Sequence, residues 1–200
     1  MKLTDLDKRD TELAIRSQKG DRDAYGELVT RFQNRMYSFC YQFFRNPDIA
    51  SDLAQETFLR AYRYIKKYDP DKKFSTWLYS IAKNICIDEH RKMGRGKTVS
   101  IDDLPPEKIR STEDSLHLKN PMQISMQIQD RMMLEEAIGR LPEKYRTVII
   151  LCYFQEMPYQ EIADVLGLNL NLVKVRIFRA KKRLLEILTE ESGAETGEKQ

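Results

Sequence analysis

The sequence predicts an all-α protein made of two small helical domains joined by a flexible linker. Apolar residues recur every three or four positions over long stretches, which is typical of amphipathic helices. The 200 residues include 8 Gly and 7 Pro, so few strong breakers interrupt these stretches. One segment rich in Gly, Pro, Ser and Thr lacks the period. We therefore predict a first domain at 12–93, a linker at 94–128, a second domain at 129–190 and a disordered tail at 191–200.

Three helices are predicted in the first domain. Asn46 and Pro47 separate the first two, because Pro suits the first turn of a helix and Asn can cap it. Residues 66–75 follow no consistent period and are predicted to form a loop, after which a third helix opens at Ser75 and Thr76. The buried stripes are Ala24, Leu28, Phe32, Met36, Phe39 and Phe43, then Ile49, Leu53, Ala54, Phe58, Ala61, Tyr62 and Ile65, then Trp77, Leu78, Ile81, Ala82 and Ile85.

The second domain is predicted to hold four helices. The first has an apolar stripe from Leu134 to Leu141, and Pro142 and Pro158 open the next two. Gly167 supplies a left-handed stop for the third, and Asn169 or Asn171 can cap the fourth. That last helix buries Val173, Ile177, Ala180, Leu184 and Ile187.

Basic side chains are concentrated on this last helix, although 34 Lys and Arg against 31 Asp and Glu give a net charge of only +3. A short helix, a turn with Gly167 and a basic second helix describe a helix-turn-helix, whose second helix fits the major groove of DNA. Glu161 and Ala163 suit the polar and the small position of that motif. The alternative is an ordinary solvated amphipathic helix. The residues available to DNA are Asn171, Lys174, Val175, Arg176, Arg179, Lys182 and Arg183.

Aromatic and basic residues are interleaved from Tyr62 to Asn84. Rings that stack on bases and ammonium groups that follow phosphates suit unpaired nucleic acid. Because Tyr62 and Trp77 fall on apolar stripes, we interpret both as core residues, and the lysines of this segment are the better candidates for contact.

No catalytic residue, metal site or cofactor is predicted. Cys40, Cys86 and Cys152 are far apart in the sequence and flanked by apolar residues, which favours neither a disulfide framework nor a zinc site. His90 and His117 have no nearby carboxylate pair. The sequence also has no signal peptide and no run long enough to span a membrane, so we expect a cytoplasmic protein without membrane insertion.

Several blocks of the sequence together resemble the extracytoplasmic-function (ECF, group IV) sigma factors of the sigma-70 family. The blocks, in order, are GDRDAYGELVTRF, DIASDLAQETFLRAYRYI, KFSTWLYSIAKNICIDEHRK, LPEKYRTVIILCYFQEMPYQEIADVLGL and VKVRIFRAKKRL. The resemblance implies a non-enzymatic subunit whose region 2 and region 4 bind the β′ clamp and the β flap of bacterial core RNA polymerase. It also implies binding to promoter DNA and control by an anti-sigma factor, usually membrane-anchored.

The resemblance assigns roles to particular residues of this chain. Asp52, Gln55 and Glu56 match the helix face that binds the β′ clamp, although an ordinary solvated face is the alternative. The second helix of the helix-turn-helix would read the minus-thirty-five element as duplex. The melted minus-ten element would be captured by Lys72, Lys73, Phe74, Ser75 and Asn84.

The turn before the last helix departs from the family pattern. Leu172 and Val175 replace two hydroxyl-bearing positions, so a cap or a phosphate contact is missing, although Asn171 is able to cap the helix instead. The competing hypothesis is an autonomous helix-turn-helix regulator. The first domain speaks against it, since it has the Lys-aromatic loop in place of a ligand-pocket or phospho-acceptor pattern.

Overall fold

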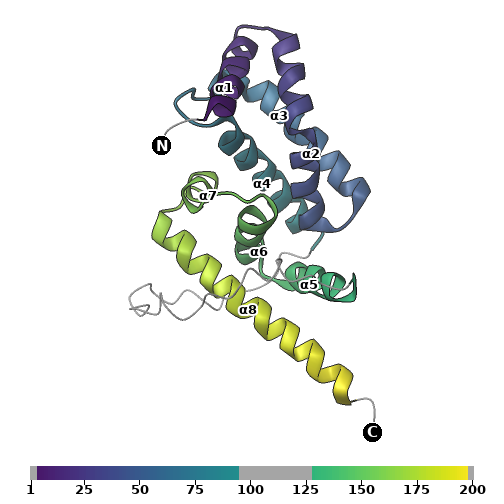
Figure 1. The fold of residues 1–200 in the computed structure, drawn as a ribbon. Helices are drawn as coiled ribbons and strands as arrows, with labels where there is room; N and C mark the ends of the chain where they lie inside the picture. Colours follow the sequence, from purple (N-terminus) through teal and green to yellow (C-terminus); the bar gives the residue numbers. More distant parts are fainter. Residues whose placement is uncertain (1–3, 95–127, 198–200) are drawn as a thin grey trace.

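The computed structural model describes residues 4–94 and 128–197, and all regular structure in these ranges is helical (Figure 1). The predicted fold class is therefore confirmed. The linker predicted at 94–128 lies almost entirely outside the described residues.

The chain begins with a helix that the sequence analysis did not predict, α1 (Asp5–Gln18). Thr4 and Asp7 form a capping box at its start: the Asp7 N–H donates to Thr4 Oγ1 over 3.2 Å, and the Thr4 N–H donates to Asp7 Oδ2 over 2.9 Å. The helix buries Leu13 and Ala14 and packs against α2. The first domain therefore begins earlier than the predicted residue 12.

The three predicted helices of the first domain are α2 (Arg22–Phe44), α3 (Pro47–Tyr64) and α4 (Phe74–Lys92), with a 3-10 turn η1 (Ile65–Lys67) after α3. Asn46 Oδ1 caps α3 by accepting from the N–H groups of Asp48 and Ile49 over 2.9 and 3.0 Å. All six predicted stripe residues of α2 are buried. Tyr62 is the exception on α3: it is 44% exposed, so its interpretation as a core residue was wrong.

Two of the three cysteines meet in this core. Cys40 on α2 and Cys86 on α4 are fully buried free thiols whose sulfur atoms lie 3.7 Å apart. The hydrogen bond to Cys40, together with burial, raises the pKa of the Cys86 thiol. Both side chains therefore act as small hydrophobic groups between the two helices.

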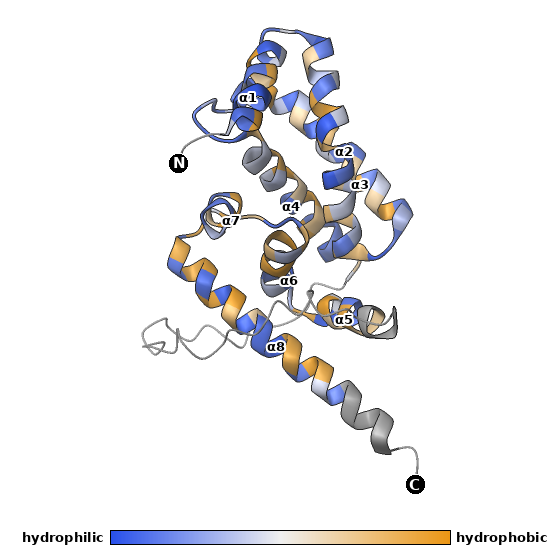
Figure 2. Ribbon diagram, in the orientation of Figure 1, coloured by the Kyte–Doolittle hydropathy of each residue, from blue (hydrophilic) through white to orange (hydrophobic). Residues whose placement is uncertain are grey.

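The second half consists of α5 (Ile128–Arg140), α6 (Glu143–Ile149), a π-helical turn η3 (Ile150–Phe154), α7 (Tyr159–Leu166) and α8 (Leu170–Gly197). Figure 2 shows hydrophobic and hydrophilic segments alternating along α8, as expected for an amphipathic helix. The helix continues through 191–197, which were predicted to be disordered. Extending an existing helix avoids the cost of nucleation, and Glu and Ala in this stretch favour it.

The two halves pack against each other in the structure. Buried residues of both halves form one continuous hydrophobic cluster, in which α7 lies against α4 and η3 lies against α2 (Figure 1). The first half therefore presents one side to α7 and leaves the outer side of α3 uncovered.

Candidate nucleic-acid interface

A helix-turn-helix is present at α7 and α8, as predicted. Gly167 ends α7 in the left-handed conformation with φ 64°, and the Leu168 N–H donates to the Ala163 carbonyl over 2.9 Å. Ala163 is 1% exposed and Val173 is fully buried. These small and branched side chains hold the two helices in close contact and leave the opposite side of α8 free of the core.

Asn169, and not Asn171, caps α8. The Asn169 Oδ1 accepts a hydrogen bond from the Leu172 N–H over 2.8 Å, which satisfies one of the donors left open at the start of the helix. Of the two asparagines predicted as candidates, Asn169 takes this role, because Asn171 already lies inside the first turn. Its exposed side chain remains available to DNA.

None of the seven predicted contact residues of α8 is buried. Asn171, Lys174, Lys182 and Arg183 are exposed, while Val175, Arg176 and Arg179 are half-buried. A further basic residue, Lys181, instead lies over the Tyr153 ring, with Nζ 5.2 Å from the ring centroid. The exposed side of the helix therefore combines an amide with several cations, which suits base edges and phosphates.

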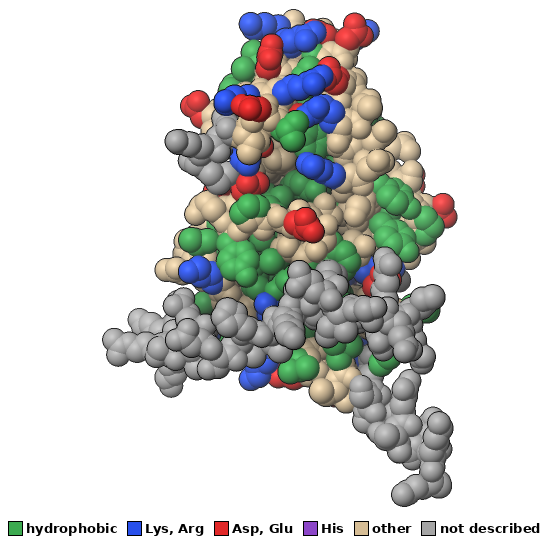
Figure 3. All heavy atoms as spheres, viewed as in Figure 1, with side chains coloured by type: hydrophobic (Ala, Val, Ile, Leu, Met, Phe, Trp, Pro, Cys, Tyr) green, Lys and Arg blue, Asp and Glu red, His purple; other side chains and the backbone are tan. Residues whose placement is uncertain are grey.

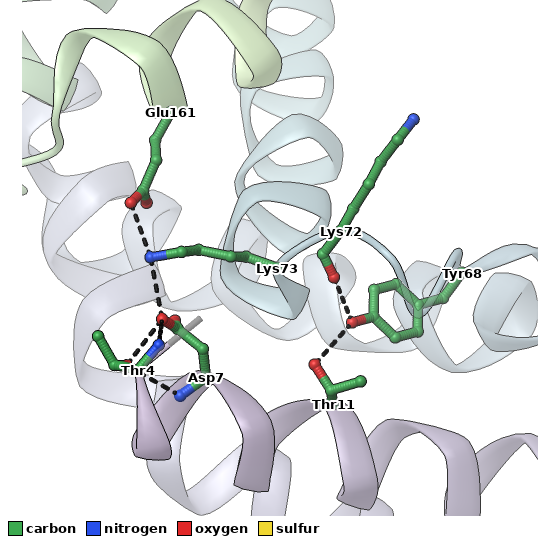
Figure 4. Close-up of polar contacts among 7 residues, drawn as sticks. All are labelled: Thr4, Asp7, Thr11, Tyr68, Lys72, Lys73 and Glu161. Carbon is green, nitrogen blue, oxygen red and sulfur yellow. Dashed lines mark hydrogen bonds and ion pairs between the residues drawn. The ribbon is translucent and has the colours of Figure 1, made fainter. Parts of the chain in front are cut away.

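The second predicted DNA contact, the segment from Lys72 to Ser75, is held by α1 and α7 (Figure 4). Lys72 extends into solvent, with a side chain 72% exposed. The Lys73 side chain is 14% exposed, and its Nζ lies 3.0 Å from Asp7 Oδ2 and 2.8 Å from Glu161 Oε1. Burial alone would lower the pKa of Lys73, but the hydrogen bonds to Glu161 and Asp7 outweigh burial and raise it.

Residues of α1 and the loop fix the shape of this segment, and sequence reasoning missed them. The Tyr68 hydroxyl donates to the Lys72 carbonyl over 2.6 Å and lies 3.3 Å from the Thr11 hydroxyl (Figure 4). The Gln18 amide donates to the carbonyls of Ile65 and Tyr68 over 2.9 and 2.8 Å. Thr11 and Gln18 gave no signal in the sequence, since α1 itself was not predicted.

Phe74 is a core residue, which corrects its prediction as a DNA contact. The side chain is 1% exposed, and its ring packs against Phe32 and Tyr68 with centroids 5.5 Å away in each case. Phe74 is the first residue of α4, where its ring anchors the helix to α2 and the loop. Its function in this position is to hold the loop in place.

The structure brings Lys72, Lys73 and Ser75 together, but not Asn84. Asn84 lies nine residues beyond Ser75 on α4, about two and a half helical turns, and therefore on the opposite side of the helix. Ser75 is half-buried beside α7, whereas Asn84 is exposed. A single DNA strand that contacts both Ser75 and Asn84 must therefore pass across α4.

The predicted polymerase-binding residues lie on the uncovered side of α3. Asp52 and Gln55 are exposed, and Glu56 is half-buried and forms an ion pair with Arg60, with 2.6 Å between Oε1 and Nε. Leu59, which the sequence analysis did not single out, adds a 54% exposed apolar side chain at the same helical spacing. The exposed side of α3 therefore combines acidic side chains with an exposed leucine.

Charge elsewhere is mixed. In the view of Figure 3, basic and acidic side chains are interspersed over α1 and α2 and do not form one continuous basic field. Among the described residues no group of three His, Cys, Asp or Glu side chains could hold a metal ion. Within the same ranges, every helix is too short or too polar to cross a membrane.

Two family models match the chain. The model described as Sigma-70 region 2 matches residues 28–96, and the model described as Sigma-70, region 4 matches residues 131–184. The first match runs from within α2 to the end of α4, and the second runs from within α5 to the basic part of α8.

Two curated relatives match over at least nine-tenths of their own length. The ECF RNA polymerase sigma factor SigW of Bacillus subtilis (strain 168) is 35% identical over 170 residues, which cover 84% of this chain and 90% of SigW. The ECF RNA polymerase sigma-E factor of Escherichia coli (strain K12) is 32% identical over 176 residues, covering 88% and 92%.

Solved structures share the fold. CnrH in complex with the cytosolic domain of CnrY superposes with a TM-score of 0.66 at 25% identity, covering 91% of this chain and 98% of that chain. The sigma factor RpoE of Bartonella quintana superposes with a TM-score of 0.57 at 22% identity, over 82% and 96%, which concerns the fold alone. The matches over both halves, together with a relative 35% identical over 90% of its length, show that the chain belongs to the ECF RNA polymerase sigma factors of the sigma-70 family.

Proposed function

We propose that this chain binds bacterial core RNA polymerase and directs transcription initiation at a particular set of promoters. The observation that carries the proposal is the pairing of a helix-turn-helix that has an exposed basic side with a separate Lys-rich segment at the start of α4. The chain is 35% identical to SigW over a match that covers 90% of SigW, which supports a common activity.

The outer side of α8 reads the minus-thirty-five element as duplex in this proposal. Asn171, Lys174 and Val175 lie in the first two turns, where a helix seated in the major groove reaches base edges. Arg176, Arg179, Lys182 and Arg183 lie further along and neutralise phosphates, which position the helix.

The start of α4 captures the melted minus-ten strand. Lys72, Lys73 and Ser75 contact the backbone, and Asn84 hydrogen-bonds a base edge through its amide, which has both donors and an acceptor. Phe74 supports this segment from the core. The linker predicted at 94–128 couples the two weak DNA contacts through effective concentration.

Core polymerase binds through Asp52, Gln55 and Glu56 of α3, with Leu59 as an additional apolar contact. The β′ clamp is the partner for this face, and the β flap is the partner for region 4. We place this action in the cytoplasm and assign the chain no catalytic step.

We also propose an anti-sigma factor as a partner. CnrH was solved with the cytosolic domain of CnrY, and RpoE of Bartonella quintana was solved with the anti-sigma factor NepR. A protein that covers the same faces of this chain would keep it inactive, and such a protein could be anchored in the membrane.

The test is run-off transcription on a pool of genomic promoters with sigma-free core polymerase, with and without this protein, at a stated salt concentration. Initiation at a discrete set of promoters supports the proposal. Duplex binding without core binding or initiation would favour an autonomous helix-turn-helix regulator instead.

Matched variants separate the two DNA contacts. Lys174→Ala should weaken duplex binding and lower its salt dependence by about one phosphate contact. Asn84→Ala should leave duplex binding intact and impair opening of the promoter. Lys19→Ala removes an exposed cation at the end of α1 and serves as the control that should change neither.

A further inference from the structure

Two cysteines of the first half lie in direct contact, although they are far apart in the sequence. Cys40 of α2 and Cys86 of α4 are separated by 46 residues, and their sulfur atoms lie 3.7 Å apart in the core. A disulfide bond requires about 2.05 Å between the sulfur atoms, so rotation of the two side chains and a slight approach of the helices can bring them within bonding distance. The third cysteine, Cys152, lies on η3 in the second half.

The segment between these two cysteines carries several proposed functional contacts. Residues 41–85 include all of α3, with Asp52 and Gln55, and also Lys72–Ser75 and Asn84 of the second DNA contact. The two thiols point into the core, whereas Asp52, Gln55 and Asn84 are exposed. A bond between the thiols would therefore close a loop around these contacts without covering them.

We propose that Cys40 and Cys86 form a reversible oxidation site, at which hydrogen peroxide or an organic hydroperoxide converts the two thiols into a disulfide that stabilises the first half. In the first step, peroxide oxidises one thiol to a sulfenic acid and is reduced to one water. The other sulfur then attacks the sulfenic sulfur: the S–S bond forms, the S–O bond breaks, and hydroxide leaves with the thiol proton as a second water.

Burial controls how fast this reaction occurs. Both thiols are 0% exposed, and the hydrogen bond to Cys40 together with burial raises the pKa of Cys86, which keeps its thiolate fraction low. Oxidation therefore requires a transient opening between α2 and α4. Once one sulfur is oxidised, the other lies closer than any external thiol, so the disulfide forms in preference to further oxidation. Brief exposure to peroxide leaves the pair reduced, and sustained exposure links it.

Thiol mapping of the full chain tests the site. The protein is treated with hydrogen peroxide, the excess is removed with catalase, and remaining thiols are alkylated in guanidinium chloride. Trypsin places Cys40 and Cys86 in separate peptides, 36–45 and 84–91, which we expect to find joined and to separate after dithiothreitol. A chain unfolded in guanidinium chloride before treatment should also give links to Cys152, because the fold no longer selects the partner.

Three variants identify the sulfur atoms and measure the effect on stability. Cys40→Ala and Cys86→Ala should each abolish the link, whereas Cys152→Ala is the matched control that keeps it. The melting temperature of each protein is compared before and after oxidation, so any packing defect of the substitution itself cancels. Oxidation should raise the melting temperature of the unaltered protein and of Cys152→Ala by roughly 5 to 15 °C. It should not raise that of Cys40→Ala or Cys86→Ala.

Two results would overturn the oxidation site. One is a folded protein in which Cys40 and Cys86 stay reduced under a treatment that links cysteines of the unfolded chain. The other is a protein with the Cys40–Cys86 link that melts no higher than the reduced protein.

Run-off transcription relates the link to activity, and this step alone rests on the proposed function. The oxidised protein should initiate as well as the reduced protein, and it should survive a heat pulse that inactivates the reduced protein. Initiation by the reduced protein alone would overturn the inference that the link leaves the functional contacts uncovered. If neither form initiates, the proposed function fails, while thiol mapping and melting still decide whether the disulfide forms and stabilises the chain.

Discussion

Phe74 shows how an aromatic residue in a DNA-binding segment can act from inside the core. Phe74→Ala should lower the free energy of unfolding by about 3 to 5 kcal/mol, because it leaves a cavity between α2 and α4. Phe74→Leu keeps most of the apolar volume and should cost much less. Urea denaturation measures both. If Phe74→Ala has unaltered stability but no longer binds the melted strand, the result would support direct contact between Phe74 and DNA.

Asn169 and Asn171 are two asparagines of the same turn with different roles. Asn169→Ala removes the cap of α8 and should lower the free energy of unfolding by about 1 kcal/mol. Asn171→Ala should leave stability unchanged and weaken duplex binding, since its side chain is exposed. Thermal melting and duplex binding of the two variants separate these roles. The prediction fails if Asn171→Ala is the less stable of the pair.

Side chains that contact one another over long separations could not be identified from the sequence. Lys73 was predicted to contact DNA, yet its partner Glu161 lies 88 residues away and was assigned only as a polar position of the helix-turn-helix. Periodicity reports which side of a helix is buried, but not what lies against it. Exposure was easier to predict: Asp52, Gln55, Asn171 and Lys174 lie off the apolar stripes, and all four are exposed.

At the scale of the elements, α1 depends on the carboxylate of Asp7. This group contacts Thr4 in the capping box and also pairs with Lys73. Burial by itself would raise the pKa of Asp7, but hydrogen bonds with Thr4 and the charge of Lys73 hold it below the ordinary value of 3.8. A lowered pKa in the folded state contributes stability above the ordinary pKa of the carboxyl, and this is lost as the pH falls through the folded value. Acid should therefore loosen α1.

Comparison with Asp7→Asn checks this dependence. The melting temperature of the unaltered protein should exceed that of Asp7→Asn near neutral pH, and the difference should shrink as the pH falls below about 4. Asp5→Asn, on the same turn with a side chain 99% exposed, should show no comparable difference at any pH. If the difference in melting temperature between the unaltered protein and Asp7→Asn is the same at every pH, the ionised form of Asp7 does not contribute to stability.

The strongly periodic helices were predictable, and the weakly apolar ones were not. The stripe of α2 has six apolar members at helical spacing, and all are buried. In α1, two of the four buried residues are polar, Asp10 and Ser17, so its inner face gave no apolar stripe to recognise. Tyr62 failed in the opposite way: it was placed on the stripe of α3, but its side chain is 44% exposed while the adjacent Ala61 is fully buried.

At the scale of the whole molecule, the continuous core predicts cooperative unfolding. Buried residues of both halves belong to one cluster, so urea denaturation followed by helix content and by Trp77 emission should give coincident transitions. A Trp77 transition at clearly lower urea would show that the halves separate before either unfolds. Glu161→Gln should move the Trp77 transition to lower urea, and Asp164→Asn should not.

The unbroken length of α8 has a mechanical consequence. Its 28 residues form a rod of about 42 Å, with the DNA-reading side chains in its first half. Because the helix is unbroken, a small rotation imposed at its C-terminal end also moves its N-terminal end. A partner that bound the C-terminal end of α8 would therefore change the orientation of Asn171 and Lys174 relative to the major groove of DNA without contacting either residue.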